Sequence, residues 1–244
     1  MKQTIWLFVT VIFFQGFGQN LALAETKGEE HLVEINYPID TLAPYKNRRR
    51  THGGTFGVHT ENYVPRRWES LIDQEYYEDS YGKAPILLTS LEGGYKYNFS
   101  LGSLNFMGGL GYGEAQTSYG GGSRKINIVK YYGRGMFALD NILPEPYIVP
   151  YIAGSVWKMK IKESEDISDF GGTVTSGIGF DYTFGALFQL NWLDEDFARE
   201  SLSNSGIQNT FIDVFATQYL KTLNKADPSL ASGLTFGLGL RLEF

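Results

Sequence analysis

The chain has 244 residues, of which 43% are hydrophobic, 15% aromatic and 20% charged, and its formal net charge is -6. These proportions exclude a disordered chain, and the acidic balance excludes a strongly basic nucleic-acid binder. Because the chain has no cysteine and only three histidines, we expect no disulfide, no thiolate nucleophile, no metal centre and no cofactor.

The first 24 residues have the three parts of a secretory signal peptide. Lys2 gives a positively charged start, the segment 5–14 is almost wholly apolar, and Ala22-Leu23-Ala24 has the A-x-A pattern of a cleavage site. A transmembrane anchor is the alternative, but the apolar run is about half of the roughly 20 residues that a spanning helix needs. We therefore predict that residues 1–24 are a signal peptide, cleaved after Ala24, and that the mature chain is exported.

Residues 25–50 are polar and irregular, and we predict that they form a periplasmic tail before a single all-β domain at 51–244. The tail ends in Arg48, Arg49 and Arg50, which either meet lipid phosphates at the membrane interface or keep the segment soluble. From residue 51 onward, apolar residues recur with a period of two, which predicts strands. The eight predicted strands are 51–62, 84–98, 103–114, 125–139, 147–161, 173–190, 209–219 and 232–244.

These strands are longer than those of typical soluble proteins and long enough for a tilted strand to cross a bilayer. In the last strand, apolar side chains from Leu234 to Phe244 alternate strictly with small or charged ones. Alternation alone does not say whether the apolar face is a soluble core or a lipid-facing surface. Two observations favour lipid: glycine is concentrated on the other face, and aromatic residues such as Tyr95, Trp157 and Trp192 gather near strand ends.

The lengths of the connections are a third observation in favour of a membrane barrel, because short periplasmic turns alternate there with long external loops. The connection 194–208 breaks this rule, and its acidic start and Gly206 predict a helical periplasmic turn, with additional strands as the alternative. The predicted fold is therefore an eight-stranded antiparallel transmembrane β-barrel with one helical periplasmic connection. The other connections are short at 99–102 and 141–146 and longer at 63–83, 115–124, 162–172 and 220–231.

A signal peptide, eight amphipathic strands and a last strand that ends in Phe244 resemble the small outer-membrane β-barrel proteins of Gram-negative bacteria. The resemblance covers about residues 51–244 and is one of pattern. It implies an outer-membrane location, with outer-membrane lipid, lipopolysaccharide and the barrel-assembly machinery as partners. It also implies an assembly signal on the apolar face of the last strand, formed by Phe236, Leu240, Leu242 and Phe244.

If the apolar face meets lipid, the opposite face places charged side chains in a lumen that eight strands leave just wide enough to fill. Unpaired charges would be costly there, so we predict that carboxylates pair with lysine or arginine across the lumen. A plugged barrel is the preferred interpretation, and a gated polar path is the alternative. The predicted lumen charge network consists of Glu92, Lys96, Lys130, Arg134, Lys158, Asp181, Asp213 and Arg241.

Lipid A-modifying barrels are the enzymatic alternative. Their deacylase type needs a His-x-Ser pair in the later strands, and this chain has no histidine after His59. Their acyltransferase type needs a histidine near the first strand and an Asp-Ser pair in the first long loop, and His59 and Asp79-Ser80 lie in loosely similar places. We predict no catalytic residues and a structural or surface-recognition role, toward a surface ligand that the sequence does not identify. A passive channel for small molecules and, after it, a lipid A acyltransferase are the alternatives.

Overall fold

The computed structural model describes residues 43–119, 122–166, 171–224, 227 and 229–244. The predicted signal peptide with its cleavage after Ala24, and residues 25–42 of the predicted tail, lie outside this range. The helices are α2 (Tyr45–Arg48), α3 (Tyr77–Ser80) and α4 (Glu195–Ser205). The strands are β1 (His52–Tyr63), β2 (Ile86–Asn98), β3 (Ser103–Tyr119), β4 (Gly122–Ala138), β5 (Ile148–Glu165), β6 (Gly171–Thr175), β7 (Gly179–Gln189), β8 (Asn209–Tyr219) and β9 (Leu234–Glu243).

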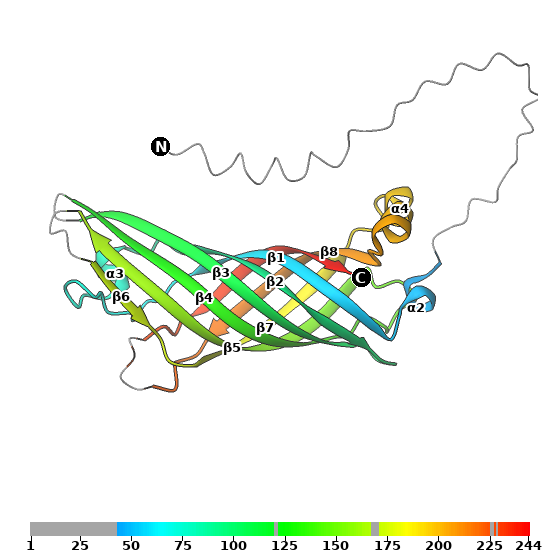
Figure 1. The fold of residues 1–244 in the computed structure, drawn as a ribbon, viewed down its shortest axis with the longest axis horizontal. Helices are drawn as coiled ribbons and strands as arrows, with labels where there is room; N and C mark the ends of the chain where they lie inside the picture. Colours follow the sequence, from blue (N-terminus) through cyan, green and yellow to red (C-terminus); the bar gives the residue numbers. More distant parts are fainter. Residues whose placement is uncertain (1–42, 120–121, 167–170, 225–226, 228) are drawn as a thin grey trace, which may run out of the picture. The chain divides into compact units, whose positions relative to one another are not determined.

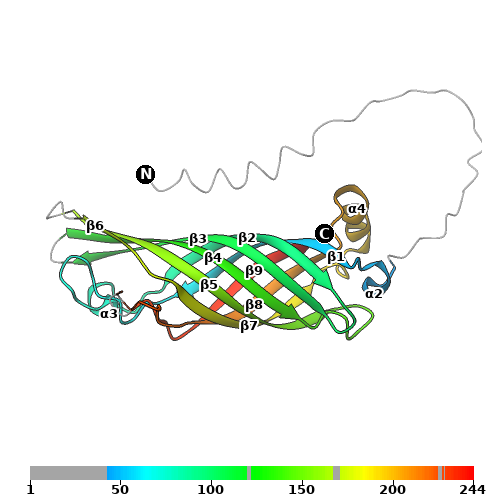
Figure 2. The same ribbon diagram turned by 60° about the horizontal axis from the view of Figure 1, so that its bottom comes forward.

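The strands form one closed antiparallel sheet, in which β9 pairs back onto β1 and β4 pairs with β5 (Figures 1 and 2). Strands β6 and β7 both pair with β5, on residues 160–164 and 148–157 respectively. In the gap between them, the Ser176 amide donates to the carbonyl of Met159 at 2.8 Å. Strands β6 and β7 thus act as one interrupted strand, and the predicted eight-stranded barrel is confirmed.

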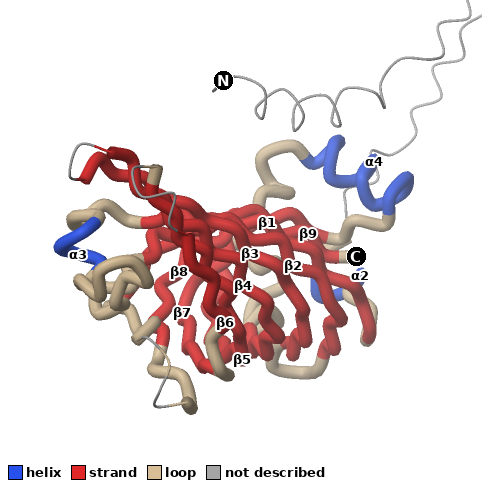
Figure 3. Tube along the Cα trace, turned by 60° about the vertical axis from the view of Figure 1, so that its left-hand side comes forward, coloured by secondary structure: helices blue, strands red, loops and turns tan. Residues whose placement is uncertain are grey.

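The two ends of the barrel differ (Figure 1). The turn end, as we call it, carries α2, α4 and Phe244, whereas the opposite loop end carries α3 and β6. Figure 3 shows the connections at the loop end gathered around α3. The predicted loops at 115–124 and 162–172 are mostly strand instead, because β3, β4 and β5 continue past the predicted boundaries to Tyr119, Gly122 and Glu165.

Helix α4 is the predicted helical connection. Asp194 caps its start by accepting a hydrogen bond from the Phe197 amide at 2.9 Å, and Glu195 and Asp196 place negative charge in its first turn. Gly206 ends it in the left-handed conformation, with φ 70°. The alternative of additional strands at 194–208 is therefore wrong. No helix in the described part of the chain is long and apolar enough to cross a membrane.

The apolar face of the sheet points outward. Phe236 and Leu238 on β9 are 64% and 56% exposed, and their counterparts on the other strands form a continuous apolar belt. A soluble barrel would bury this face, so the soluble interpretation is wrong. The belt includes Phe56, Leu91, Phe106, Leu110, Ile152, Val156, Phe184 and Val214.

Toward the loop end the interior holds a large cluster of apolar and aromatic side chains. Trp68, Tyr77 and Tyr81 of the 64–85 connection pack between the strands in a buried cluster that we call the aromatic plug. Trp157 belongs to this plug and is 1% exposed, so its predicted place at a lipid interface is wrong. The other members of the plug are Tyr63, Ile86, Leu88, Ile126, Ile128, Tyr132, Met159, Ile161, Tyr219 and Leu230.

Candidate functional site: the charged lumen

Inward-facing glycines make room for the large side chains of the lumen. A Cβ atom on Gly237 would overlap the ring of Phe215, and one on Gly109 would overlap the ring of Tyr132. Strand alternation sends every second side chain inward, so a barrel this narrow cannot hold a large residue at each position. The glycines on the inner face therefore follow from how tightly the lumen is filled.

The middle of the lumen holds two arginines and two carboxylates. Glu92 binds Arg134 at 3.1 Å and Arg241 at 2.8 Å, one with each carboxylate oxygen. Arg241 also reaches Asp213 at 3.2 Å. The Tyr151 hydroxyl donates to Asp213 at 2.7 Å. Each of these four charges is almost fully buried, so the cluster depends on mutual neutralisation.

Nearer the loop end, Lys130 lies between two carboxylates. Its ammonium is 3.6 Å from Asp181 and 3.8 Å from Glu61, and it donates to the Tyr219 hydroxyl at 2.6 Å. That hydroxyl in turn donates to Glu61. The Lys130 nitrogen also lies 4.7 Å from the centre of the Tyr132 ring, within cation–π range.

At the turn end, α2 contributes to a third cluster. Lys96 binds Asp140 at 2.8 Å and also pairs with Glu243, and Arg49 binds the other oxygen of Asp140 at 2.6 Å. Tyr45 inserts from α2, accepting from Lys96 at 2.9 Å and donating to Glu243 at 3.2 Å. Burial and then the Glu243 carboxylate raise the pKa of Tyr45, which keeps its hydroxyl a hydrogen-bond donor.

Seven of the eight predicted lumen charges lie in these clusters: Glu92, Lys96, Lys130, Arg134, Asp181, Asp213 and Arg241. Lys158 does not, because the inward positions of this part of β5 are Trp157 and Met159 and Lys158 is exposed on the outer face. The sequence prediction missed Glu61, Asp140, Glu243 and the α2 residues. Glu61 and Glu243 lie two residues from His59 and Arg241 and point to the same inner face, so the alternation alone could have identified them.

On the loop-end side of the aromatic plug, polar residues bind the 64–85 connection to the long strands. Arg124 on β4 binds Asp73 at 2.8 Å and Glu165 at 3.3 Å. Glu163 on β5 accepts from the Leu71 amide at 2.8 Å and from the Tyr81 hydroxyl at 2.9 Å. These contacts form what we call the loop latch.

The residues of the acyltransferase alternative are not brought together. His59 is buried in the lumen, with its ring edge-on to Phe215 and next to Tyr132. The Ser80 hydroxyl instead accepts a hydrogen bond from Arg124 in the loop latch. Arg124 and Tyr132 are eight residues apart on β4, roughly 26 Å along an extended strand, so His59 cannot activate Ser80. Among the described residues, no group of three or more histidine, aspartate or glutamate side chains could hold a metal ion.

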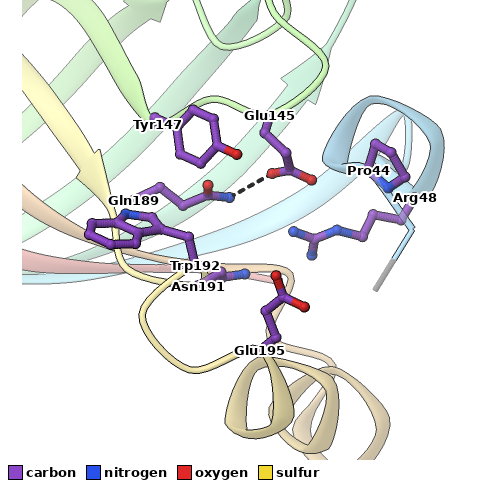
Figure 4. A pocket seen from close by; sticks show the side chains of 8 residues that line it. All are labelled: Pro44, Arg48, Glu145, Tyr147, Gln189, Asn191, Trp192 and Glu195. Carbon is purple, nitrogen blue, oxygen red and sulfur yellow. Dashed lines mark hydrogen bonds between the residues drawn. The ribbon is translucent and has the colours of Figure 1, made fainter. Parts of the chain in front are cut away.

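A small cavity of about 140 Å³ lies at the turn end, where α2 meets the barrel (Figure 4). Its polar groups are hydrogen-bonded: Gln189 donates to Glu145 at 3.1 Å, and Arg48 donates to Asn209 beside the cavity at 3.2 Å. The same Glu145 accepts from the Tyr45 amide at 2.6 Å. These hydrogen bonds hold α2 against the barrel, and Arg48 and Arg49 also donate to the backbone carbonyls of Gln208 and Phe99. The lining is Pro44, Arg48, Glu145, Tyr147, Gln189, Asn191, Trp192 and Glu195.

No family model matches the chain, and no curated protein matches it. Among solved structures it is similar to Ail, the attachment invasion locus protein of Yersinia pestis, with 12% identity and a TM-score of 0.42 over 79% of this chain and 97% of that one. It is also similar to the N-terminal β-barrel domain of Pseudomonas aeruginosa OprF, with 12% identity and a TM-score of 0.39 over 80% and 98%. It is similar as well to Neisserial surface protein A, with 11% identity and a TM-score of 0.40 over 79% of this chain and 96% of that one. At this identity the likeness is one of fold.

Proposed function

We propose that the chain is a closed, non-enzymatic barrel of the Gram-negative outer membrane, with a structural or surface-recognition role. One observation carries the proposal: the barrel is apolar outside and filled inside by paired charges and the aromatic plug. Such a wall suits a bilayer, and such an interior leaves no continuous water path for solutes.

The orientation follows from the two ends. Membrane barrels of this kind keep short turns in the periplasm and longer segments outside the cell. The turn end therefore faces the periplasm, and the loop end, with its long hairpins and the 64–85 connection, faces outward. Exposed tyrosines such as Tyr76, which is 50% exposed, suit contact with a surface ligand.

Assembly in the membrane is the second part of the proposal. Phe236 and Leu240 are exposed on the outer face of β9, Leu242 shares that face, and the exposed Phe244 directly follows the strand. Strand β9 closes the barrel on β1, where the Phe244 amide donates to the Gly54 carbonyl at 3.0 Å. We propose that the barrel-assembly machinery reads this apolar face before β9 pairs with β1.

Conductance of the purified, heat-modifiable protein in planar lipid bilayers tests the closed barrel. We expect a silent bilayer, both for the natural protein and for the Lys125→Ala variant, whose side chain lies on the outer face of β4. Steady conductance that changes with Arg134→Ala but not with Lys125→Ala would contradict the proposal and establish the channel alternative.

A further inference from the structure

Three lysines of β5 form a row on the outer face of the barrel. Lys158, Lys160 and Lys162 occupy alternate, exposed positions, while the residues between them point into the aromatic plug. Same-face neighbours on a strand are roughly 7 Å apart, so the ammonium groups lie close to one another. We call this row the lysine stripe.

The lysine stripe has no acidic partner among the described residues. Its cross-strand neighbours on β4 are Tyr131, Val129 and Asn127. On β6, Thr175 and Thr173 lie beside the second and third lysines. None of the ion pairs formed by the described residues involves the stripe, although nearby Lys125 pairs with Glu114 at 3.0 Å. The stripe therefore concentrates uncompensated positive charge on a chain whose formal net charge is -6.

The lysine stripe begins where the apolar belt ends. Val156, the preceding outward residue of β5, is 48% exposed and belongs to the belt. Tyr131, opposite Lys158, is 50% exposed, as is Tyr112 on β3. Exposed tyrosines at the rim of an apolar belt mark the membrane–water interface. The stripe thus rises from the interface at the loop end, at the height of lipid headgroups.

We infer that Lys158, Lys160 and Lys162 bind the phosphate groups of phosphorylated outer-leaflet glycolipid. Lysine is a compact phosphate-binding charge, and its flexible stem lets the ammonium follow a headgroup while the methylenes cover apolar surface. The neighbouring threonine hydroxyls can donate to phosphate oxygens. The inference rests on the proposed function, because only an outer-membrane barrel with its loop end outward presents the stripe to that leaflet.

Binding of purified lipid A to the folded, heat-modifiable protein in neutral detergent tests the inference. The variant is Lys158→Gln/Lys160→Gln/Lys162→Gln. Its control, Arg67→Gln/Lys83→Gln/Lys221→Gln, removes the same charge from exposed residues elsewhere. At about fivefold per lysine near a charged membrane surface, we expect roughly 100-fold weaker binding by the stripe variant at low salt. The control variant should bind like the natural protein, and lipid A stripped of its phosphates should bind equally weakly to all three.

Two outcomes would overturn the inference. Equal binding of phosphorylated lipid A by the stripe and control variants would remove the stripe as the site. Competition by inorganic phosphate at the same concentration as lipid A would mean that the site takes free phosphate and not the lipid. Absence of a heat-dependent shift in gel mobility for the natural protein would instead refute the proposed barrel. Failure of the barrel can therefore be told apart from failure of the lysine-stripe inference.

Discussion

Strand β5 carries opposite chemistry along its two halves. In the belt, Ile152 and Val156 point outward and Ser155 points into the charged lumen. Toward the loop end, lysines point outward and Trp157 points into the aromatic plug. The alternation continues without a break while its polarity reverses, as the proposed change of the outer surroundings from lipid to water would require. The reversal marks the height of the membrane surface more directly than any single residue.

Removing a carboxylate from the charged lumen inside the belt should lower the stability of the barrel most. Glu92→Gln leaves Arg134 and Arg241 without the carboxylate that they share, and removing one partner of a buried pair costs about 3–5 kcal/mol. Urea unfolding in micelles, followed by the heat-modifiable mobility shift, measures this loss. Glu114→Gln is the control, because it breaks an exposed pair that contributes about 0–1 kcal/mol. Equal losses would show that the lumen charges do not hold the barrel together.

The contrast between the inner and outer faces of the belt can be tested with glycines. Gly237→Ala places a methyl group against the ring of Phe215, and such overpacking costs about 1–3 kcal/mol. Gly133→Ala is the matched control, since nothing lies within 4 Å of its new methyl group and the position is exposed. The same unfolding assay compares them. A Gly133→Ala variant as unstable as Gly237→Ala would mean that the two faces are assigned wrongly.

The Asp73 contact of the loop latch should weaken in acid. Burial would raise the pKa of Asp73, but hydrogen bonds from Arg124 and Ser70 outweigh it and hold that pKa below its usual value. A carboxylate with a lowered pKa stabilises the latch above its unfolded pKa and loses this contribution as the pH falls through the lowered value. We therefore expect faster cleavage of the 64–85 connection by an acid-tolerant protease as the pH falls below the usual aspartate pKa of about 4.

The variant Asp73→Asn should abolish this acid response and cleave faster already at neutral pH. Arg66→Gln is its control, because it removes an exposed pair with Glu78 in the same connection. If both variants keep the acid response of the natural protein, Asp73 is not its source.

The smallest effect is expected for the residues of the enzymatic alternative. His59→Ala and Ser80→Ala should leave the acyl composition of lipid A unchanged, because His59 lies in the lumen and Ser80 in the loop latch. Mass spectrometry of lipid A from cells expressing each variant, with a deletion strain beside them, provides the readout. A change that depends on both residues would restore an enzymatic role.

The wall of the barrel was predictable from its period, and the contents of its loop end were not. The predicted strand 209–219 coincides with β8, whose inward and outward positions alternate except at Ala216, which is buried. The inference from alternation fails for Lys158, since the sequence does not reveal that Trp68 and Tyr77 fold back to cover the inner face beside it. Tyr45 was missed for a similar reason: a short helical turn in a polar tail carries no periodic signal for insertion into a barrel.

Single-cysteine labelling tests the central claim, an apolar outer face in lipid below a polar outer face in water. The chain has no cysteine, so Leu238→Cys in the belt and Lys160→Cys in the lysine stripe each provide one reactive thiol. In intact cells, a membrane-impermeant maleimide should label Lys160→Cys rapidly and Leu238→Cys only after denaturation. Equal labelling of the two in intact cells, or recovery of the protein in the soluble periplasmic fraction, would contradict the account.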